Sequence, residues 1–471
     1  DRSPSRGLGD VYKRQSLPYM YPVCPVSIDH ARLFVIADII ARYHRETHNV
    51  LFPIAAHYSG VTADIIMDKI GKQNQETINL YVNYYKMPKN DLERIKSSVE
   101  LLDYYSEQML NNLRELQISC EYEHFYKTNS NKYEIFVKIM FEQYLKQNMI
   151  ISNDSNELAL NFNNTHWRYN TREFISSMEF IQKFHKKNIL GSFDTLTDDF
   201  GFIRPYGIGT SYAANQIIDP MFDGDFFMLF DAITREINID DYSDALFATL
   251  VENIFKAASG ISHENDIVID RILSWLPCDV FVCEEHLKTW IVKKAFSEVL
   301  LLKPEYRTKK YFITGLGSRN NKRMSSSRGN AVLLKDLLEQ HGSIKARMLI
   351  LLCGGHPSKN YHYDEELIKT VDNMINKFGK YYYKNLLGIN THSNYLIRAL
   401  EIEENTIKRY IEEGYYGQAI NTLMIGIPST YKNNPNYIVR EDISYLCEKY
   451  LEILLPGITE YIRGLWDGER I

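Results

Sequence analysis

Residues 27–60 read SIDHARLFVIADIIARYHRETHNVLFPIAAHYSG, and their pattern indicates the architecture more clearly than any other segment. Apolar side chains cover more than one face of the helix that the pattern predicts from about His30 to His48, which is typical of a helix buried on both sides. Leu17–Tyr21 is interpreted as the end of a short strand before it, and Val50–Ala56 as an apolar strand after it. Strand, helix and strand in this order predict a parallel βαβ unit.

The start of this predicted helix carries polar residues where an anion would bind. Backbone N–H groups at a helix N-terminus lack partners and carry a partial positive charge, which attracts phosphate. Ser27, Asp29 and His30 lie there, and we expect Asp29 to be the N-cap. His30 can donate to a phosphate oxygen, whereas the Asp29 carboxylate repels one. Two unit charges about 4 Å apart repel by roughly 4 kcal/mol at an effective dielectric constant near 20.

A second polar segment, residues 322–330, reads KRMSSSRGN. It ends a stretch from Tyr306 to Asn330 that contains basic residues and no Asp or Glu. The basic residues are Arg307, Lys309, Lys310, Arg319, Lys322, Arg323 and Arg328. Two interpretations stay open at this point: a basic strip that binds a triphosphate or the end of an RNA, or a solvated basic face.

The order of the two segments resembles that of the class I aminoacyl-tRNA synthetases, and most of all leucyl-tRNA synthetase of the archaeal type. In that family a His-x-Gly-His motif opens the first helix, and patterns of the kind HxRxxxIADxxARY and NVLFPxxxHxxG follow. This chain reads HARLFVIADIIARY and NVLFPIAAHYSG. Ser27 and Asp29 stand in place of the first His and the Gly, and His30 keeps the last His. Residues 322–330 resemble the KMSKS loop, with Arg323 and Ser326 at its two Lys positions.

The resemblance implies a set of site residues. Catalytic roles fall to His30, Arg323 and Ser326. ATP-binding positions are Ser27, Asp29, His30, Lys322, Arg323, Met324, Ser325, Ser326 and Ser327. The segments at 204–210 and 222–228 resemble the family's SRGLGTP and SDSTIYM patterns, and the implied amino-acid pocket comprises His57, Tyr58, Gly207, Gly209 and Asp223.

The resemblance further implies ATP-dependent activation of leucine, or a related amino acid, and its transfer to tRNA, with Mg²⁺ accompanying the nucleotide. Because the altered motif residues weaken this inference, two alternatives stay open: a paralogue with a changed reaction in a small-molecule pathway, and an inactive tRNA- or protein-binding module. The segment from Glu121 to Arg204 is too short for the family's editing domain, so we expect no hydrolytic editing. We expect no metal site of the protein's own, and the absence of any C-x-x-C pair makes zinc unexpected.

The predicted fold is α/β: a doubly wound, Rossmann-like parallel sheet with a helical connective insertion and a C-terminal helical bundle. Residues 454–460 and 464–466 resemble the anticodon-binding bundle of the family, and residues 148–170 read as an irregular connection. Residues 1–15, a leader before the fold, are expected to be non-native or disordered. The predicted segments are a leader at 1–15, the two halves of the nucleotide fold at 16–64 and 166–318, the insertion at 65–165, the KMSKS-like loop region at 319–345 and the bundle at 346–471.

Composition sets broad limits on the class of protein. The chain has 471 residues, of which 45% are hydrophobic and 24% charged, so a sizeable core is expected. Its net charge of −6 means that any contact with nucleic acid depends on a local basic patch. Scattered cysteines are typical of a reducing, cytoplasmic setting. No apolar run is long enough for a membrane span. We also expect the protein to be a monomer.

Overall fold

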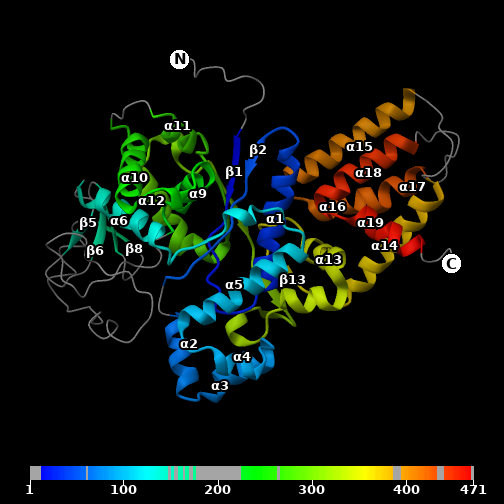
Figure 1. The fold of residues 1–471 in the computed structure, drawn as a ribbon. Coiled ribbons are helices and arrows are strands. Elements are labelled where there is room, and N and C mark those ends of the chain that lie inside the picture. The colour runs from blue at the N-terminus through cyan, green and yellow to red at the C-terminus, as the bar shows by residue number, and fades with distance from the viewer. Residues whose placement is uncertain are drawn as a thin grey trace. The chain divides into compact units, whose positions relative to one another are not determined.

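The computed structural model describes residues 12–59, 62–146, 150–152, 158–162, 165–168, 173–176, 224–261, 266–385, 394–431 and 440–467 (Figure 1). The chain divides into two compact units. Unit 1 comprises Asp1–Cys24, Asn49–Glu107 and Cys120–Phe312, and unit 2 comprises Pro25–His48, Gln108–Ser119 and Ile313–Ile471. This division differs from the predicted segments, because the first helix belongs to unit 2 whereas the strands on either side of it in sequence belong to unit 1.

A four-stranded sheet with the order β10-β9-β1-β2 carries the βαβ topology. Strand β1 pairs in parallel with both β2 and β9. The predicted α/β fold with a parallel sheet is therefore confirmed. The strands are β1 (Tyr12–Ser16), β2 (Asn49–Leu51), β9 (Asp279–Cys283) and β10 (Lys310–Thr314).

The position of β1 corrects two predictions. The strand ends at Ser16, before the predicted strand end at Leu17–Tyr21, and it begins at Tyr12, so part of the range 1–15 belongs to the fold. Its sequence, YKRQS, lacks an apolar pattern. A strand between two neighbours is held by backbone hydrogen bonds, which do not depend on side-chain type, so the pattern gave no signal. Strand β10 is half-buried over most of its length.

Residues 62–146 are mostly helical, and all of this range except Gln108–Ser119 belongs to unit 1. The range contains α2 (Thr62–Gly71), α3 (Gln75–Asn79), a π-helical turn at Leu80–Tyr84, α4 (Lys89–Arg94), α5 (Ser98–Glu115) and α6 (Asn131–Lys146). Between α5 and α6, strand β4 (Tyr126–Lys127) pairs in parallel with β3 (Ala55–Ala56).

The segment expected to be an irregular connection instead forms an antiparallel sheet of four strands in sequence order. They are β5 (Ile150–Ser152), β6 (Leu158–Phe162), β7 (Thr165–Arg168) and β8 (Glu173–Ser176). Alternation is short in each strand, and the many Asn residues obscured it. The remaining helices of unit 1 are α9 (Phe227–Glu236), α10 (Asp244–Ser259), α11 (Ile267–Ser274) and α12 (Val292–Leu301).

Unit 2 combines α1 (Ile28–Arg45), a small three-stranded sheet and the C-terminal helices. The strands are β11 (Gly317–Arg319), β12 (Lys322–Arg323) and β13 (Tyr361–His362). The helices gather from yellow to red in Figure 1. They are α13 (Leu334–Leu352), α14 (Leu367–Asn385), α15 (Asn394–Glu412), α16 (Tyr416–Asn421), α17 (Ile427–Tyr431), α18 (Arg440–Leu454) and α19 (Ile458–Asp467).

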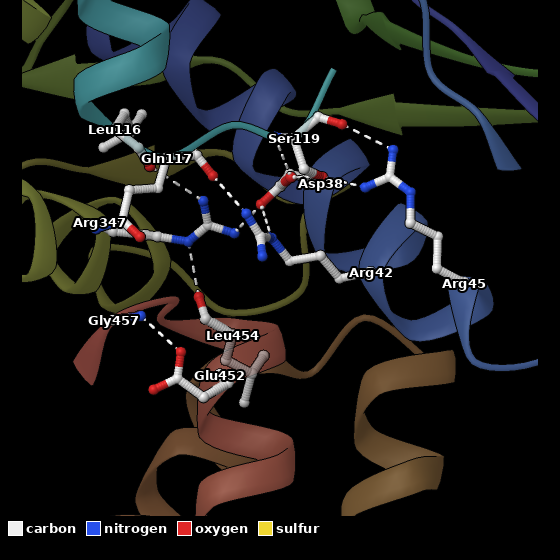
Figure 2. Close-up of polar contacts among 10 residues, drawn as sticks. All are labelled: Asp38, Arg42, Arg45, Leu116, Gln117, Ser119, Arg347, Glu452, Leu454 and Gly457. Atoms are coloured by element: carbon white, nitrogen blue, oxygen red, sulfur yellow. Dashed lines mark hydrogen bonds and ion pairs between the residues drawn. The ribbon is translucent and has the colours of Figure 1, made fainter. Parts of the chain in front are cut away.

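A buried polar cluster, the Asp38 hub (Asp38, Arg42, Ser119 and Arg347), joins several segments of unit 2 (Figure 2). Asp38 of α1 accepts hydrogen bonds from Arg347 of α13 at 2.5 Å, from Arg42 at 2.8 Å and from the backbone of Ser119 at 2.7 Å. Arg347 also donates to the carbonyl of Leu454, which ends α18, at 2.7 Å. The hub thus connects the first helix to the C-terminal helices.

Candidate functional site

The KMSKS-like segment begins as a β-hairpin in unit 2. Strands β11 and β12 pair antiparallel, with Ser318 opposite Arg323 and Arg319 opposite Lys322. Asn320 and Asn321 form the connection, with φ of 51° and 59°. Asn tolerates this left-handed conformation, and a two-residue connection of this kind matches the twist of a hairpin. The segment therefore begins as a defined hairpin, which the sequence analysis did not predict.

The side chain of Asn330 closes the loop that follows the hairpin. Its amide oxygen accepts from the backbone N–H of Ser325 at 2.9 Å, and its amide nitrogen donates to the carbonyl of Arg323 at 3.0 Å. Met324 is buried, and its N–H donates to the carbonyl of Gly317 at 3.0 Å. Residues 324–330 are thereby held as a compact turn at the end of the hairpin.

The predicted ATP-binding residues of this loop differ in exposure. Lys322, Arg323, Ser327 and Arg328 are exposed, whereas Ser325 and Ser326 are half-buried. Lys322, Arg323 and Arg328 thus place three cationic side chains at the surface of unit 2. Ser325 and Ser327 share a hydroxyl–hydroxyl hydrogen bond of 3.0 Å.

The N-terminal motif lies beside this loop, although some 290 residues separate the two in sequence. The N–H of Ile28 donates to the carbonyl of Val332, and the N–H of Leu334 donates to the carbonyl of Val26, both at 2.8 Å. Ser27 and Leu333 form an antiparallel bridge between these bonds. The segment that ends the KMSKS-like loop is therefore paired, backbone to backbone, with the segment that starts α1.

The first turn of α1 corrects the prediction that Asp29 is the N-cap. The helix begins at Ile28, so Ser27 is the N-cap and Asp29 lies inside the first turn. The Ser27 hydroxyl is 3.1 Å from Nδ1 of the exposed His30 and makes no capping bond to the helix. Asp29 instead accepts two hydrogen bonds on one carboxylate oxygen, from the N–H of Gly317 at 3.0 Å and from the hydroxyl of Tyr361 at 2.8 Å.

Comparison with known proteins relates part of this sequence to archaeal leucine--tRNA ligases. No protein-family model matches the sequence. Leucine--tRNA ligase 1 of Saccharolobus solfataricus is 28% identical over 123 residues, which is 26% of this chain and 13% of that protein. The leucine--tRNA ligase of Archaeoglobus fulgidus is 27% identical over 137 residues, 29% of this chain and 15% of that protein. The matched stretches thus span about one seventh of the length of these relatives.

Solved structures match nearly the whole chain. The ternary complex of Agrobacterium radiobacter K84 agnB2 LeuRS with tRNA and LeuAMS aligns with a TM-score of 0.60 at 11% identity, covering 99% of this chain and 86% of that one. Mycobacterium tuberculosis methionyl-tRNA synthetase in complex with methionyl-adenylate aligns with a TM-score of 0.57 at 12% identity, covering 96% and 93%. The chain has the class I aminoacyl-tRNA synthetase fold. Its sequence similarity to the archaeal leucyl enzymes is distant and partial.

The predicted amino-acid pocket of this synthetase-like chain falls in unit 1 or outside the described residues. His57 is half-buried, and its ring packs edge-on against Tyr21 with centroids 5.8 Å apart. Tyr58 is buried, and its hydroxyl donates to Asp103 at 2.6 Å. Gly207, Gly209 and Asp223 lie outside the residues that the structure describes. A role for these five residues in binding an amino acid stays a prediction.

The basic strip is divided between the units. Arg307, Lys309 and Lys310 belong to unit 1, and the other four basic residues belong to unit 2. Of those four, Arg319 forms an ion pair with Glu365. The cationic side chains within the KMSKS-like segment itself, residues 322–330, are Lys322, Arg323 and Arg328.

Asp231 is a buried acidic residue of unit 1 that the sequence analysis did not identify. It lies in α9 and accepts hydrogen bonds from the hydroxyls of Tyr19 and Tyr126, both at 2.8 Å, and from Arg14 at 2.8 Å. Burial raises the pKa of Asp231 to about 6, although Arg14 opposes the shift. A lone Asp within the apolar sequence FMLFDAITRE was the available signal.

Within the described ranges, no group of three or more His, Cys, Asp and Glu side chains is placed to hold a metal ion. The prediction that the protein has no metal site of its own remains a prediction. In the same ranges, no helix is both long enough and apolar enough to cross a bilayer.

Proposed function

We propose that the protein activates an amino acid, leucine or a related one, at the expense of ATP and transfers it to tRNA. The observation that carries this proposal is the pairing of Val26–Ile28 with Val332–Leu334, because it brings the start of α1 and the KMSKS-like loop to one place. The partial similarity to archaeal leucine--tRNA ligases supports leucine. The tRNA in the complex of the structurally similar LeuRS supports tRNA as the acceptor.

The proposed chemistry is an in-line attack of the amino-acid carboxylate on the α-phosphate of ATP. It forms an aminoacyl-adenylate and releases pyrophosphate. The reaction needs positioning and stabilisation of negative charge more than it needs covalent help from the protein. His30 would donate to a phosphate oxygen, and the N-terminus of α1 adds a partial positive charge. Lys322, Arg323 and Arg328, all exposed, would stabilise the leaving pyrophosphate.

Mg²⁺ would arrive with the nucleotide. Its ligands would then be mainly phosphate oxygens and water, as is usual for this ion, so no cage of protein carboxylates is required. Bound in this way, the ion would neutralise charge on the triphosphate. Cytoplasmic location and a monomeric state stay predictions.

The second candidate function is that of a paralogue that has lost or changed the activation reaction. One observation favours it: a carboxylate, Asp29, lies in the first turn of the helix that would face the triphosphate. The small residue Ser326, at the second Lys position of the loop, also favours a lost or changed activation reaction. Such a chain would keep the fold as a module that binds tRNA or protein, or would serve a small-molecule pathway.

The experiment is ATP–pyrophosphate exchange by the full chain, run with each of the twenty amino acids in turn. We expect exchange that depends on leucine. Exchange with a different amino acid would contradict leucine specificity while retaining the activation chemistry. If folded protein, and a folded Asp29→Gly variant, give no exchange with any amino acid, the proposal is wrong and the inactive module is the better account.

A further inference from the structure

The carboxylate of Asp29 lies where an anionic ligand of α1 would lie. It is in the first turn of the helix, where the partial positive charge is greatest. Its two donors are a backbone N–H and a tyrosine hydroxyl, which are groups that proteins commonly use to bind phosphate oxygens. Both donors belong to the small sheet of unit 2: Gly317 begins β11, and Tyr361 begins β13.

The space around these contacts is filled. A Cβ atom placed on Gly317 would lie 2.6 Å from the Asp29 carboxylate, 2.3 Å from Cε of Met324 and 2.6 Å from the Tyr361 ring. Since real Cβ atoms do not approach other atoms this closely, not even a methyl group fits. A ligand that enters between the first turn of α1 and β11 must therefore move at least one of these groups.

Tyr361 is fixed from its other side by Arg32. The buried Arg32 guanidinium lies 4.7 Å from the centre of the Tyr361 ring and donates to the carbonyl of Ile350 at 3.1 Å. Gly354 permits this approach, because a Cβ there would lie 2.7 Å from Cβ of Tyr361. Burial and the nearby Asp29 carboxylate raise the pKa of Tyr361 well above its usual value, so its hydroxyl remains a donor at neutral pH.

We propose that Asp29, Gly317 and Tyr361 form a latch in which the Asp29 carboxylate acts as a built-in anion, and that a nucleoside triphosphate binds only when it displaces this carboxylate. The ligand class rests on the proposed function, but the existence of the latch does not. Because the latch joins α1 to β11, its opening would also loosen the contact between α1 and the hairpin that leads into the KMSKS-like loop. The fraction of molecules with an open latch then limits the apparent affinity for the nucleotide.

Limited digestion with trypsin tests the latch without any ligand. The enzyme cleaves after Lys322, Arg323 and Arg328, which are exposed, and mass spectrometry identifies cuts at these residues. The Tyr361→Phe variant keeps the ring on Arg32 and loses the donor, while Asp29→Ala loses the acceptor. We expect both to be cut in the loop about tenfold faster than the unaltered protein, as loss of a buried hydrogen bond would allow. Tyr363→Phe, two residues along the chain, is the control and should leave the rate unchanged. Unchanged cleavage in both Tyr361→Phe and Asp29→Ala would overturn the latch.

ATP binding to the same proteins, measured by equilibrium dialysis, tests the ligand. The Asp29→Gly variant, which removes the carboxylate and keeps both donors, should bind ATP about tenfold more tightly than the unaltered protein. Faster cleavage without ATP binding in any variant would leave the latch standing and would contradict the proposed function. If ATP binds equally well to all of these proteins, the carboxylate does not compete with the nucleotide and the proposal is wrong.

Discussion

Replacement of Asp38 by Ala is expected to destabilise unit 2 by about 3–5 kcal/mol, the usual effect of removing one partner from a buried ion pair. Arg347 is 1% exposed and Asp38 is fully buried, so the variant would leave a guanidinium in the protein interior without its counter-ion. The backbone N–H of Ser119 would also lose its acceptor. Because the hub joins α1 to α13 and to the end of α18, the loss should reach all three helices (Figure 2).

Hydrogen exchange followed by mass spectrometry measures this effect within unit 2. Amides in α1 and α13 should exchange about a hundredfold faster, or more, in Asp38→Ala. The control is Asp372→Ala, which removes the partner of another α13 residue, Lys345, at 2.7 Å. These side chains are 27% and 43% exposed, and such pairs contribute less than about 1 kcal/mol. Equal effects of the two substitutions would show that the hub stabilises unit 2 no more than an exposed ion pair does, which would contradict the prediction.

The contribution of Asp38 also has a defined pH dependence. Burial alone would raise its pKa, but Arg347 and Arg42 more than offset this and hold the pKa below its usual value. A carboxyl group with a lowered pKa in the folded state stabilises the fold at pH values above its unfolded pKa of about 3.9. The stabilisation is lost as the pH falls through the folded pKa, so the difference between Asp38→Ala and the unaltered protein should shrink only in strong acid.

Replacement of Arg323 by Ala should lower the rate of amino-acid-dependent ATP–pyrophosphate exchange by about a hundredfold. Removal of one group that stabilises developing charge costs 10² to 10³ in rate in enzymes of several classes, as a rough guide. Arg323 ends β12 and is exposed, and its backbone carbonyl accepts a hydrogen bond from Asn330, so the backbone from which its side chain extends is fixed. The KM for the amino acid should change little, because this charge would act on the pyrophosphate.

Arg319→Ala is the matched control for this variant. Arg319 lies in the same hairpin but outside residues 322–330, and its guanidinium forms an ion pair with Glu365. We expect less than about a threefold change in the exchange rate. An unchanged rate in Arg323→Ala, or an equal loss in both variants, would contradict the role proposed for Arg323.

The sequence predicted those parts of the fold that have a strong local pattern. Helix α1 is one example, because its apolar residues repeat over two faces and the structure has it at Ile28–Arg45. The order of α1 and the KMSKS-like segment was also informative, since the two segments are paired in the structure. Strand β1 was missed because its polar side chains hide a strand that backbone pairing determines. The short strands β5–β8 were missed for a related reason: alternation over three to five residues is a weak signal.

The candidate site was predictable as a set of positions but not as a set of contacts. Ser27, Asp29 and His30 were placed correctly at the start of α1, yet the partners of Asp29 come from residues 317 and 361, which no local pattern connects to it. The same limit applies to Asp38 and Arg347, which are 309 residues apart. Long-range polar pairs depend on tertiary packing, so a single sequence contains no periodic signal for them.

The most direct test of the central claim is photo-crosslinking of the full chain with an azido-adenosine triphosphate, followed by mapping of the labelled peptides. We propose that the nucleotide binds at the start of α1 and the KMSKS-like loop of unit 2. We therefore expect label in peptides that contain residues 26–32 or 317–330, and this label should disappear when excess ATP is present. Label that ATP competes away but that lies only in peptides of unit 1 would contradict the account.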